Sequence, residues 1–201
     1  MHTIRFHQAK YLLSAHTIRQ IPPDQGAEVV FAGRSNSGKS SVINTLTRQK
    51  ALAKTGKTPG RTRQINFFDL GNGLRLVDLP GYGYAKAPGS IKKHWYGVID
   101  AYLATRKCLM GLVLIADIRR GITDLDARLL DWSRTYGLPV HVLLNKTDKL
   151  SRGAAAAALR GTAQELVKSD LSHVTLQLFS AVKKTGVEEL EERLSAWLLQ
   201  S

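Results

Sequence analysis

Short apolar runs alternate along this chain with stretches that have helical spacing. The predicted strands are residues 28–32, 66–70, 74–78, 111–117, 139–144 and 174–179. The predicted helices are one from about residue 41 to about residue 47, those at 90–106, about 124–135 and 153–167, and a C-terminal helix with an apolar stripe at Val187, Leu190, Leu194, Trp197 and Leu198. Uniformly apolar strands that alternate with helices are typical of a parallel sheet covered on both faces. We therefore predict an α/β fold with helices on both faces of a mostly parallel, six-stranded sheet. The hairpin at Gly71-Asn72-Gly73 supplies one antiparallel strand.

The first 24 residues lack this pattern. They are polar and mixed, and Pro22-Pro23-Asp24 marks a turn before the first apolar run. We find no internal repeat or low-complexity linker. We therefore expect residues 1–24 to be a lead-in that flanks or packs on one domain formed by residues 25–201.

A glycine-rich loop follows the first predicted strand and precedes a predicted helix. Its residues fit the pattern GxxxxGK[ST]: Gly33, Arg34, Ser35, Asn36, Ser37, Gly38, Lys39 and Ser40, with Ser41 next. Glycines let such a loop approach a triphosphate, so that backbone N–H groups and the helix N-terminus face the anion. We expect Lys39 to reach the β- and γ-phosphates and the Ser40 hydroxyl to hold Mg²⁺. The loop predicts a nucleotide-binding protein.

The second motif lies at the end of a later strand and consists of Asp78, Leu79, Pro80 and Gly81. Ligands of α/β sheets bind at the carboxyl ends of the strands. Asp78 is therefore placed to join the Mg²⁺ shell, through water, and the Gly81 N–H to contact the γ-phosphate.

The third motif, Asn145-Lys146-Thr147-Asp148, ends another strand and selects the base. The Asp148 carboxylate can accept hydrogen bonds from guanine N1–H and its exocyclic amine, a donor pair that adenine lacks. We expect Asn145 to brace the site and the Lys146 stem to cover the base. Phe179-Ser180-Ala181 ends the last strand, where backbone N–H groups could meet guanine O6. The ligand is thus predicted to be GTP or GDP.

Charge adds a second class of partner. The chain has 201 residues and a formal net charge of +13, and its basic residues gather in loops near the predicted site. They include Lys54, Lys57, Arg61, Arg63, Lys86, Lys92, Lys93, Arg119, Arg120, Lys183 and Lys184. Such a surplus favours a nucleic-acid partner, although a basic, merely soluble surface is the alternative.

Composition also excludes several classes of protein. The apolar runs are too short to span a bilayer, and the start of the chain lacks a signal-peptide core. The single cysteine, Cys108, excludes an internal disulfide, and we expect it to be a small buried side chain. We expect a cytoplasmic monomer with no membrane partner. Two other functions fit a phosphate-binding loop: a small-molecule kinase, and a nucleic-acid-binding module with a silent nucleotide site.

The motifs in this order resemble a translation-factor-class GTPase domain with Ras-like topology over residues 25–200. Lys57-Thr58-Pro59-Gly60-Arg61-Thr62, Ile65-Asn66-Phe67-Phe68 and Asp78-Leu79-Pro80-Gly81-Tyr82-Gly83-Tyr84-Ala85 narrow the resemblance to the EngB family of bacterial ribosome-biogenesis GTPases. The resemblance implies a GTP-hydrolysing switch that binds a ribosomal subunit precursor and its rRNA, with the large subunit expected, and that cell growth and division need.

The resemblance also implies roles for residues that the motifs alone do not assign. Thr62 would be the switch threonine that reaches Mg²⁺, with Gly60 and Arg61 beside the nucleotide, and Thr58 is the competing candidate. Lys39, Thr62 and Gly81 are then the expected catalytic residues.

Hydrolysis raises a separate question, because Tyr82 stands where Ras has the glutamine that orients water. A phenol cannot replace the carboxamide, so we expect slow intrinsic turnover. Related GTPases with asparagine at the position of Asn36 use it to hold K⁺, which could supply the missing charge. The alternative is that Asn36 only shapes the loop.

Overall fold

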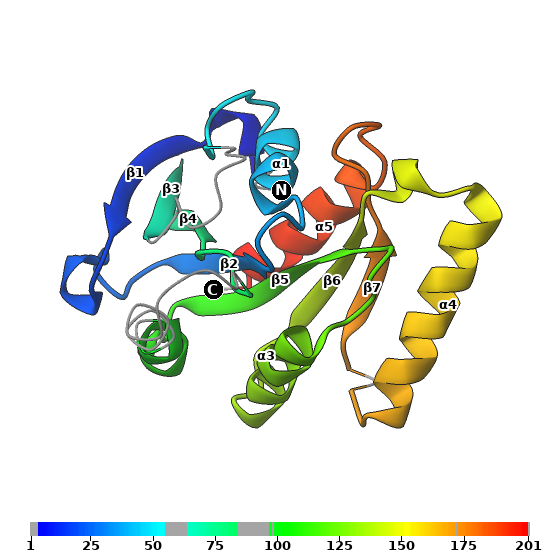
Figure 1. Cartoon of the computed structure of the whole chain (residues 1–201). Helices are drawn as coiled ribbons and strands as arrows, with labels where there is room; N and C mark the ends of the chain where they lie inside the picture. The colour runs from blue at the N-terminus through cyan, green and yellow to red at the C-terminus, as the bar shows by residue number, and fades with distance from the viewer. Residues whose placement is uncertain (1–3, 55–63, 84–96, 98, 172, 201) are drawn as a thin grey trace.

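The structure, a computed structural model, describes residues 4–54, 64–83, 97, 99–171 and 173–200 (Figure 1). A seven-stranded sheet runs through it in the order β1-β3-β4-β2-β5-β6-β7. The strands are β1 (Lys10–Ala15), β2 (Ala27–Gly33), β3 (Ile65–Gly71), β4 (Leu74–Asp78), β5 (Leu109–Asp117), β6 (Val140–Asn145) and β7 (Thr175–Leu178). Among the strands that the described residues form, the β1–β3 and β3–β4 pairs are antiparallel and the other pairs are parallel, so β3 runs against the rest of the sheet.

The mostly parallel sheet with one antiparallel strand confirms the predicted fold, but the predicted number of strands was wrong. The additional strand is β1, which lies in the polar lead-in and pairs with β3 at the edge of the sheet. Tyr11 and Leu12 are 57% and 44% exposed, and the register shifts between Tyr11 and Leu13. An irregular edge strand with exposed side chains does not show the apolar run that identifies a buried strand.

Helices cover both faces of the sheet, as predicted. They are α1 (Lys39–Leu46), α3 (Asp124–Thr135), α4 (Arg152–Lys168) and α5 (Val187–Leu198), with short 3₁₀ turns at Phe6–Gln8, Ile18–Gln20 and Thr147–Lys149. Residues 97 and 99–105 are also helical. Side chains of α1 and α5 share one core cluster with Val29 and Phe31 of β2. Side chains of α3, α4 and Tyr102 share the other with Val30 and Ala32, the alternate positions of the same strand.

A buried charge network closes the end of the sheet where β2 begins. The Glu28 carboxylate, fully buried, accepts hydrogen bonds from Arg75 Nε at 2.6 Å, Arg106 Nε at 2.8 Å and the Tyr102 hydroxyl at 2.7 Å. Burial alone would raise the pKa of Glu28, but hydrogen bonds from Arg106, Tyr102 and Arg75 outweigh it and leave this pKa below its ordinary value. Arg106 also donates to the Pro22 carbonyl at 2.8 Å, so the network holds the turn that precedes β2.

Cys108, next to this network, is buried as predicted. Burial raises the pKa of its thiol to about 12, so the thiol is protonated near neutral pH. None of the helices formed by the described residues has the length and apolar character that a bilayer crossing requires.

Candidate nucleotide site

The glycine-rich loop joins the carboxyl end of β2 to the start of α1. Its first half also pairs with the chain that follows Gly81: Ser35 N donates to Tyr82 O at 2.8 Å, and Tyr82 N donates to Gly33 O at 3.3 Å. The Ser35 hydroxyl donates to the Gly81 carbonyl at 3.2 Å. The second motif therefore lies directly against the glycine-rich loop.

Lys39 and Asp78, which sequence analysis assigned to phosphate and Mg²⁺, form a buried ion pair. They meet because Asp78 ends β4, which is paired in parallel with β2, and Lys39 begins α1. Lys39 is 7% exposed and Asp78 is 2% exposed. Ser40 follows Lys39 at the start of α1, and hydroxyl and carboxylate oxygens are ligands of the kind that Mg²⁺ prefers. This donor set fits the expected ion.

Gly38 shows why the loop needs glycine at this position. Its φ is +99°, and a Cβ there would come within 2.4 Å of Asn145 Nδ2. Asn145 lies at the end of β6, and its Nδ2 donates to the Ser37 carbonyl at 3.0 Å. The third motif thus ties the phosphate-binding loop to the centre of the sheet.

The residues expected to bind guanine come together at the ends of β6 and β7. Ser180 Oγ donates to Asp148 Oδ1 at 2.7 Å, and Thr147 Oγ1 donates to the Phe179 carbonyl at 3.1 Å. The hydrogen bond from Ser180 is the main cause that lowers the pKa of Asp148. Its carboxylate is therefore charged at neutral pH and oriented as an acceptor.

The backbone hydrogen bonds of residues 179–181 show which N–H group is available to contact guanine O6. Phe179 N donates to Leu144 O at 3.0 Å and Ser180 N to Thr185 O at 3.2 Å, so both groups have partners. Among the described residues, the Ala181 N–H has none, which makes it the candidate donor. Leu79 also contributes to the core rather than to the ligand: it is 1% exposed, and its N–H donates to Phe31 O at 3.0 Å.

Several predicted residues lie outside the described part of the chain. They are Gly60, Arg61 and Thr62, together with the competing Thr58, and the basic residues Lys57, Arg63, Lys86, Lys92 and Lys93. The choice between Thr62 and Thr58 therefore stays a prediction.

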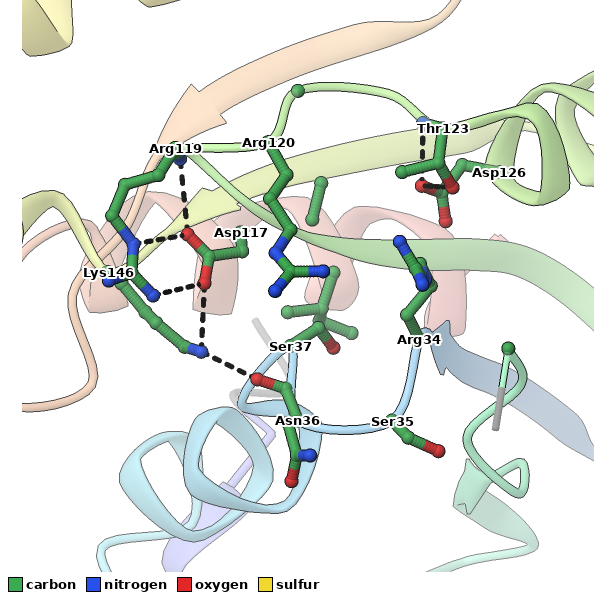
Figure 2. Close-up of a pocket in the computed structure, with 14 residues that line it drawn as sticks. Arg34, Ser35, Asn36, Ser37, Asp117, Arg119, Arg120, Thr123, Asp126 and Lys146 are labelled. Atoms are coloured by element: carbon green, nitrogen blue, oxygen red, sulfur yellow. Dashed lines mark hydrogen bonds and ion pairs between the residues drawn. The ribbon is translucent and has the colours of Figure 1, made fainter. Parts of the chain in front are cut away.

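A polar cluster that sequence analysis did not predict lies beside the loop (Figure 2). Lys146 Nζ donates to the Asn36 carbonyl at 2.6 Å and to Asp117 Oδ2 at 3.0 Å, and Arg119 Nη2 donates to Asp117 Oδ2 at 2.6 Å. Arg119, and then Lys146, hold the pKa of Asp117 well below its usual range. Asp117 ends a buried strand as Asp78 does, a signal that could have identified it as a site residue.

Comparison with known proteins, like the geometry of the site, indicates a GTP-binding protein. The family model described as "50S ribosome-binding GTPase" matches residues 28–146. The probable GTP-binding proteins EngB of Coxiella burnetii (strain RSA 331 / Henzerling II) and Azoarcus sp. (strain BH72) are 50% and 52% identical to this chain. Each alignment covers 96% of this chain and 93% of the relative.

Solved structures show the same fold. A crystal structure of a probable GTP-binding protein engB has a TM-score of 0.69 and 25% identity, and the match covers 87% of this chain and all of that one. Era in complex with MgGDPNP and nucleotides 1506–1542 of 16S ribosomal RNA has a TM-score of 0.67 at 20% identity, over 86% of this chain and 57% of Era. The chain belongs to the EngB family of GTP-binding proteins and is a GTPase.

Proposed function

We propose that this GTPase is a molecular switch in ribosome assembly, acting on a precursor of the large subunit. The observation that carries the proposal is the match of residues 28–146 to the 50S ribosome-binding GTPase model. The net charge of +13 supports an rRNA partner. Cell growth and division would then depend on the protein, and its place of action would be the cytoplasm, as a monomer. Membership of a GTPase family leaves the kinase and the silent nucleotide site without support.

The proposed chemistry divides the triphosphate among the residues of the site. Backbone N–H groups of the loop and Lys39 would hold the phosphates, Ser40 and Thr62 would bind Mg²⁺ directly, and Asp78 would bind it through water. When bound, Mg²⁺ neutralises charge that develops on the phosphates. Asp148 would select guanine, and Ala181 would contact O6.

The proposed switch uses the contact between the glycine-rich loop and the chain after Gly81. Ser35 is hydrogen-bonded to both Gly81 and Tyr82, so a group bound at the γ-phosphate position lies next to this contact. GTP would order the loops around Thr62 and Gly81, and hydrolysis would release them, as in other GTPases. Basic residues near these loops would bind rRNA in one nucleotide state.

We expect Asp148→Asn to weaken GTP and GDP binding and to improve binding of xanthine nucleotides. Charge-assisted hydrogen bonds contribute roughly 1.5–3 kcal/mol, which corresponds to about a tenfold to hundredfold loss of guanine affinity. Titration with guanine and xanthine nucleotides measures both changes. Asp131→Asn, at an exposed carboxylate on α3, is the matched control and should change neither. Unchanged guanine affinity in Asp148→Asn would place the base elsewhere.

Association with the ribosomal particle should weaken steeply as salt rises, because Lys and Arg contacts to phosphate release counterions. Replacing Lys92 and Lys93 by glutamate should weaken it further, with GDP affinity intact. Arg160→Glu with Lys168→Glu makes the same change of charge at exposed positions of α4 and serves as the control. Co-sedimentation with large-subunit precursors, at several salt concentrations and in the GDP and GTP-analogue states, tests this. Absence of co-sedimentation in every state would exclude the ribosomal role.

A further inference from the structure

A cavity of about 340 Å³ lies between the glycine-rich loop, the end of β5 and the start of α3 (Figure 2). Arg34, Asn36 and Ser37 of the loop form one wall, and Asp117, Arg120 and Thr123 form the other. The residues proposed to bind Mg²⁺ and guanine, Ser40, Asp78, Asp148 and Ser180, are not among the described residues that line it. The cavity therefore lies beside the proposed Mg²⁺ and guanine contacts, and it shares residues of the glycine-rich loop and Lys146 with the nucleotide site.

The two carboxylates that line this cavity already have donors. Asp117 accepts from Arg119 and Lys146, as described above. Asp126 accepts from Thr123 N at 2.9 Å, from Thr123 Oγ1 at 2.6 Å and from the Tyr82 hydroxyl. Among the described residues, neither Asp117 nor Asp126 forms a salt bridge with Arg34 or Arg120; the salt bridges of Asp117 are with Arg119 and Lys146.

Arg34 and Arg120 are the two remaining cations of the lining. Among the described residues, neither guanidinium has a hydrogen-bond or ion-pair partner, and Figure 2 shows both extending into the space between the two walls. Guanidinium groups keep their charge at any physiological pH. The backbone of Arg34 is fixed by its bridge to Tyr82, and its Nε lies so close to Gly83 that a Cβ there would be 2.9 Å away. The cavity thus has an excess of positive charge.

Ser37 provides an independent observation in the same lining. Ser37 is 4% exposed, and its hydroxyl has no hydrogen-bond partner among the described residues. Buried polar atoms in folded proteins nearly always have a partner, and a missing one is costly. The Ser37 oxygen is closed off from solvent, so an oxyanion in the cavity would reach this hydroxyl only after a rotation of the side chain.

We propose that this cavity binds a phosphate group, with the Arg34 and Arg120 guanidinium groups as donors. Guanidinium groups match phosphate geometry and often bind it through two parallel hydrogen bonds. The group has two possible sources, a free phosphate ion or a phosphodiester of an RNA backbone. The RNA source depends on the proposed ribosomal function, whereas the free ion does not.

The test uses the full chain loaded with Mg²⁺ and a non-hydrolysable GTP analogue, which fills the nucleotide's own phosphate positions. Inorganic phosphate and a short single-stranded oligoribonucleotide are titrated separately at constant ionic strength, and the arginine Nε–H resonances are followed by NMR. Arg120→Gln should weaken binding of the effective probe roughly tenfold. Arg120→Lys, which keeps the charge but loses the planar fork, should weaken it less. Arg128→Gln removes one exposed charge from α3 outside the cavity and should have no comparable effect.

The outcomes separate the two sources. Loss of phosphate binding in Arg120→Gln identifies the free ion, and a selective loss of oligoribonucleotide binding identifies the RNA backbone. The proposal is overturned if neither probe shifts the Nε–H resonances of Arg34 and Arg120, or if Arg128→Gln weakens binding as much as Arg120→Gln. Phosphate binding without ribosomal co-sedimentation would contradict the ribosomal role and leave the phosphate site standing.

Discussion

Lys39→Ala is expected to lower the affinity for GTP and GDP by roughly 10²- to 10⁴-fold, if two charge-assisted hydrogen bonds to phosphate are lost. Lys39 is the first residue of α1 and contacts Asp78 across the loop, where it would meet both the β- and γ-phosphates. Titration with the two nucleotides measures the loss. This is the largest binding effect that we expect from one substitution in the site.

The ion pair with Asp78 makes a second effect unavoidable. Without Lys39, Asp78 would remain as a carboxylate that is 2% exposed with its cation removed. Breaking a buried pair in this way destabilises proteins by about 3–5 kcal/mol. We therefore expect the melting temperature of nucleotide-free Lys39→Ala to fall, although Lys39 itself is not a core residue.

A double variant separates binding from stability. Adding Asp78→Asn to Lys39→Ala removes the uncompensated charge and should restore much of the melting temperature, but it should not restore nucleotide affinity. Asp78→Asn alone should mainly change the dependence of binding on Mg²⁺. If the double variant binds GTP as tightly as the parent, Lys39 has a structural role only and the phosphates are held elsewhere.

The central part of the fold was predictable because its strands are buried on both faces. Every residue of β2 and β6 is buried, and such strands appear in the sequence as continuous apolar runs. β1 could not be found in this way, since Lys10, Tyr11 and Leu12 are exposed at the sheet edge. Its pairing with β3 joins residues that are distant in the sequence, such as Lys10 and Asp69, and a local pattern of apolar residues does not indicate such a pairing.

The roles of individual site residues were predictable where a single sequence motif is enough to imply them. Two pairs of site residues meet although they lie far apart in the sequence: Lys39 with Asp78, and Asp148 with Ser180. They meet because both members of each pair lie where strands end at the carboxyl edge of a parallel sheet. The partners of Glu28 could not be predicted, because Arg75 comes from β4 whereas Tyr102 and Arg106 come from the helix at 99–105 and the residue after it, at the opposite edge of the sheet. The sequence also did not indicate that the Phe179 and Ser180 N–H groups donate hydrogen bonds to backbone carbonyl groups of the same chain.

Tyr82 links the fold to the rate of hydrolysis. It is 7% exposed, its hydroxyl donates to Asp126 in the first turn of α3, and its backbone pairs with the glycine-rich loop. A side chain held in this way packs in the core beside α3. It offers no carboxamide for orienting the attacking water, so another group has to stabilise the transition state if turnover is to be fast.

We propose K⁺ held by Asn36 as that group, and we expect GTP hydrolysis to be slow in Na⁺ and faster in K⁺. Asn36 is exposed with a φ of +69°, and its carbonyl accepts from Lys146 while its side chain extends away from the cavity (Figure 2). A cation between the phosphates would supply charge as an arginine finger does, a role worth roughly 10³–10⁵ in rate at its largest. A smaller gain is expected if the ribosome also contributes.

Rates in the two salts should be measured at equal ionic strength and saturating GTP. Asn36→Ala should remove the difference between Na⁺ and K⁺. Because alanine is strained at positive φ, Asn36→Gly is the decisive variant: it removes the amide and keeps the backbone conformation. If Asn36→Gly still responds to K⁺, the ion is bound by other groups. If the parent has equal rates in both salts, Asn36 only shapes the loop, and the charge missing from the Tyr82 position has to come from a partner such as the ribosome.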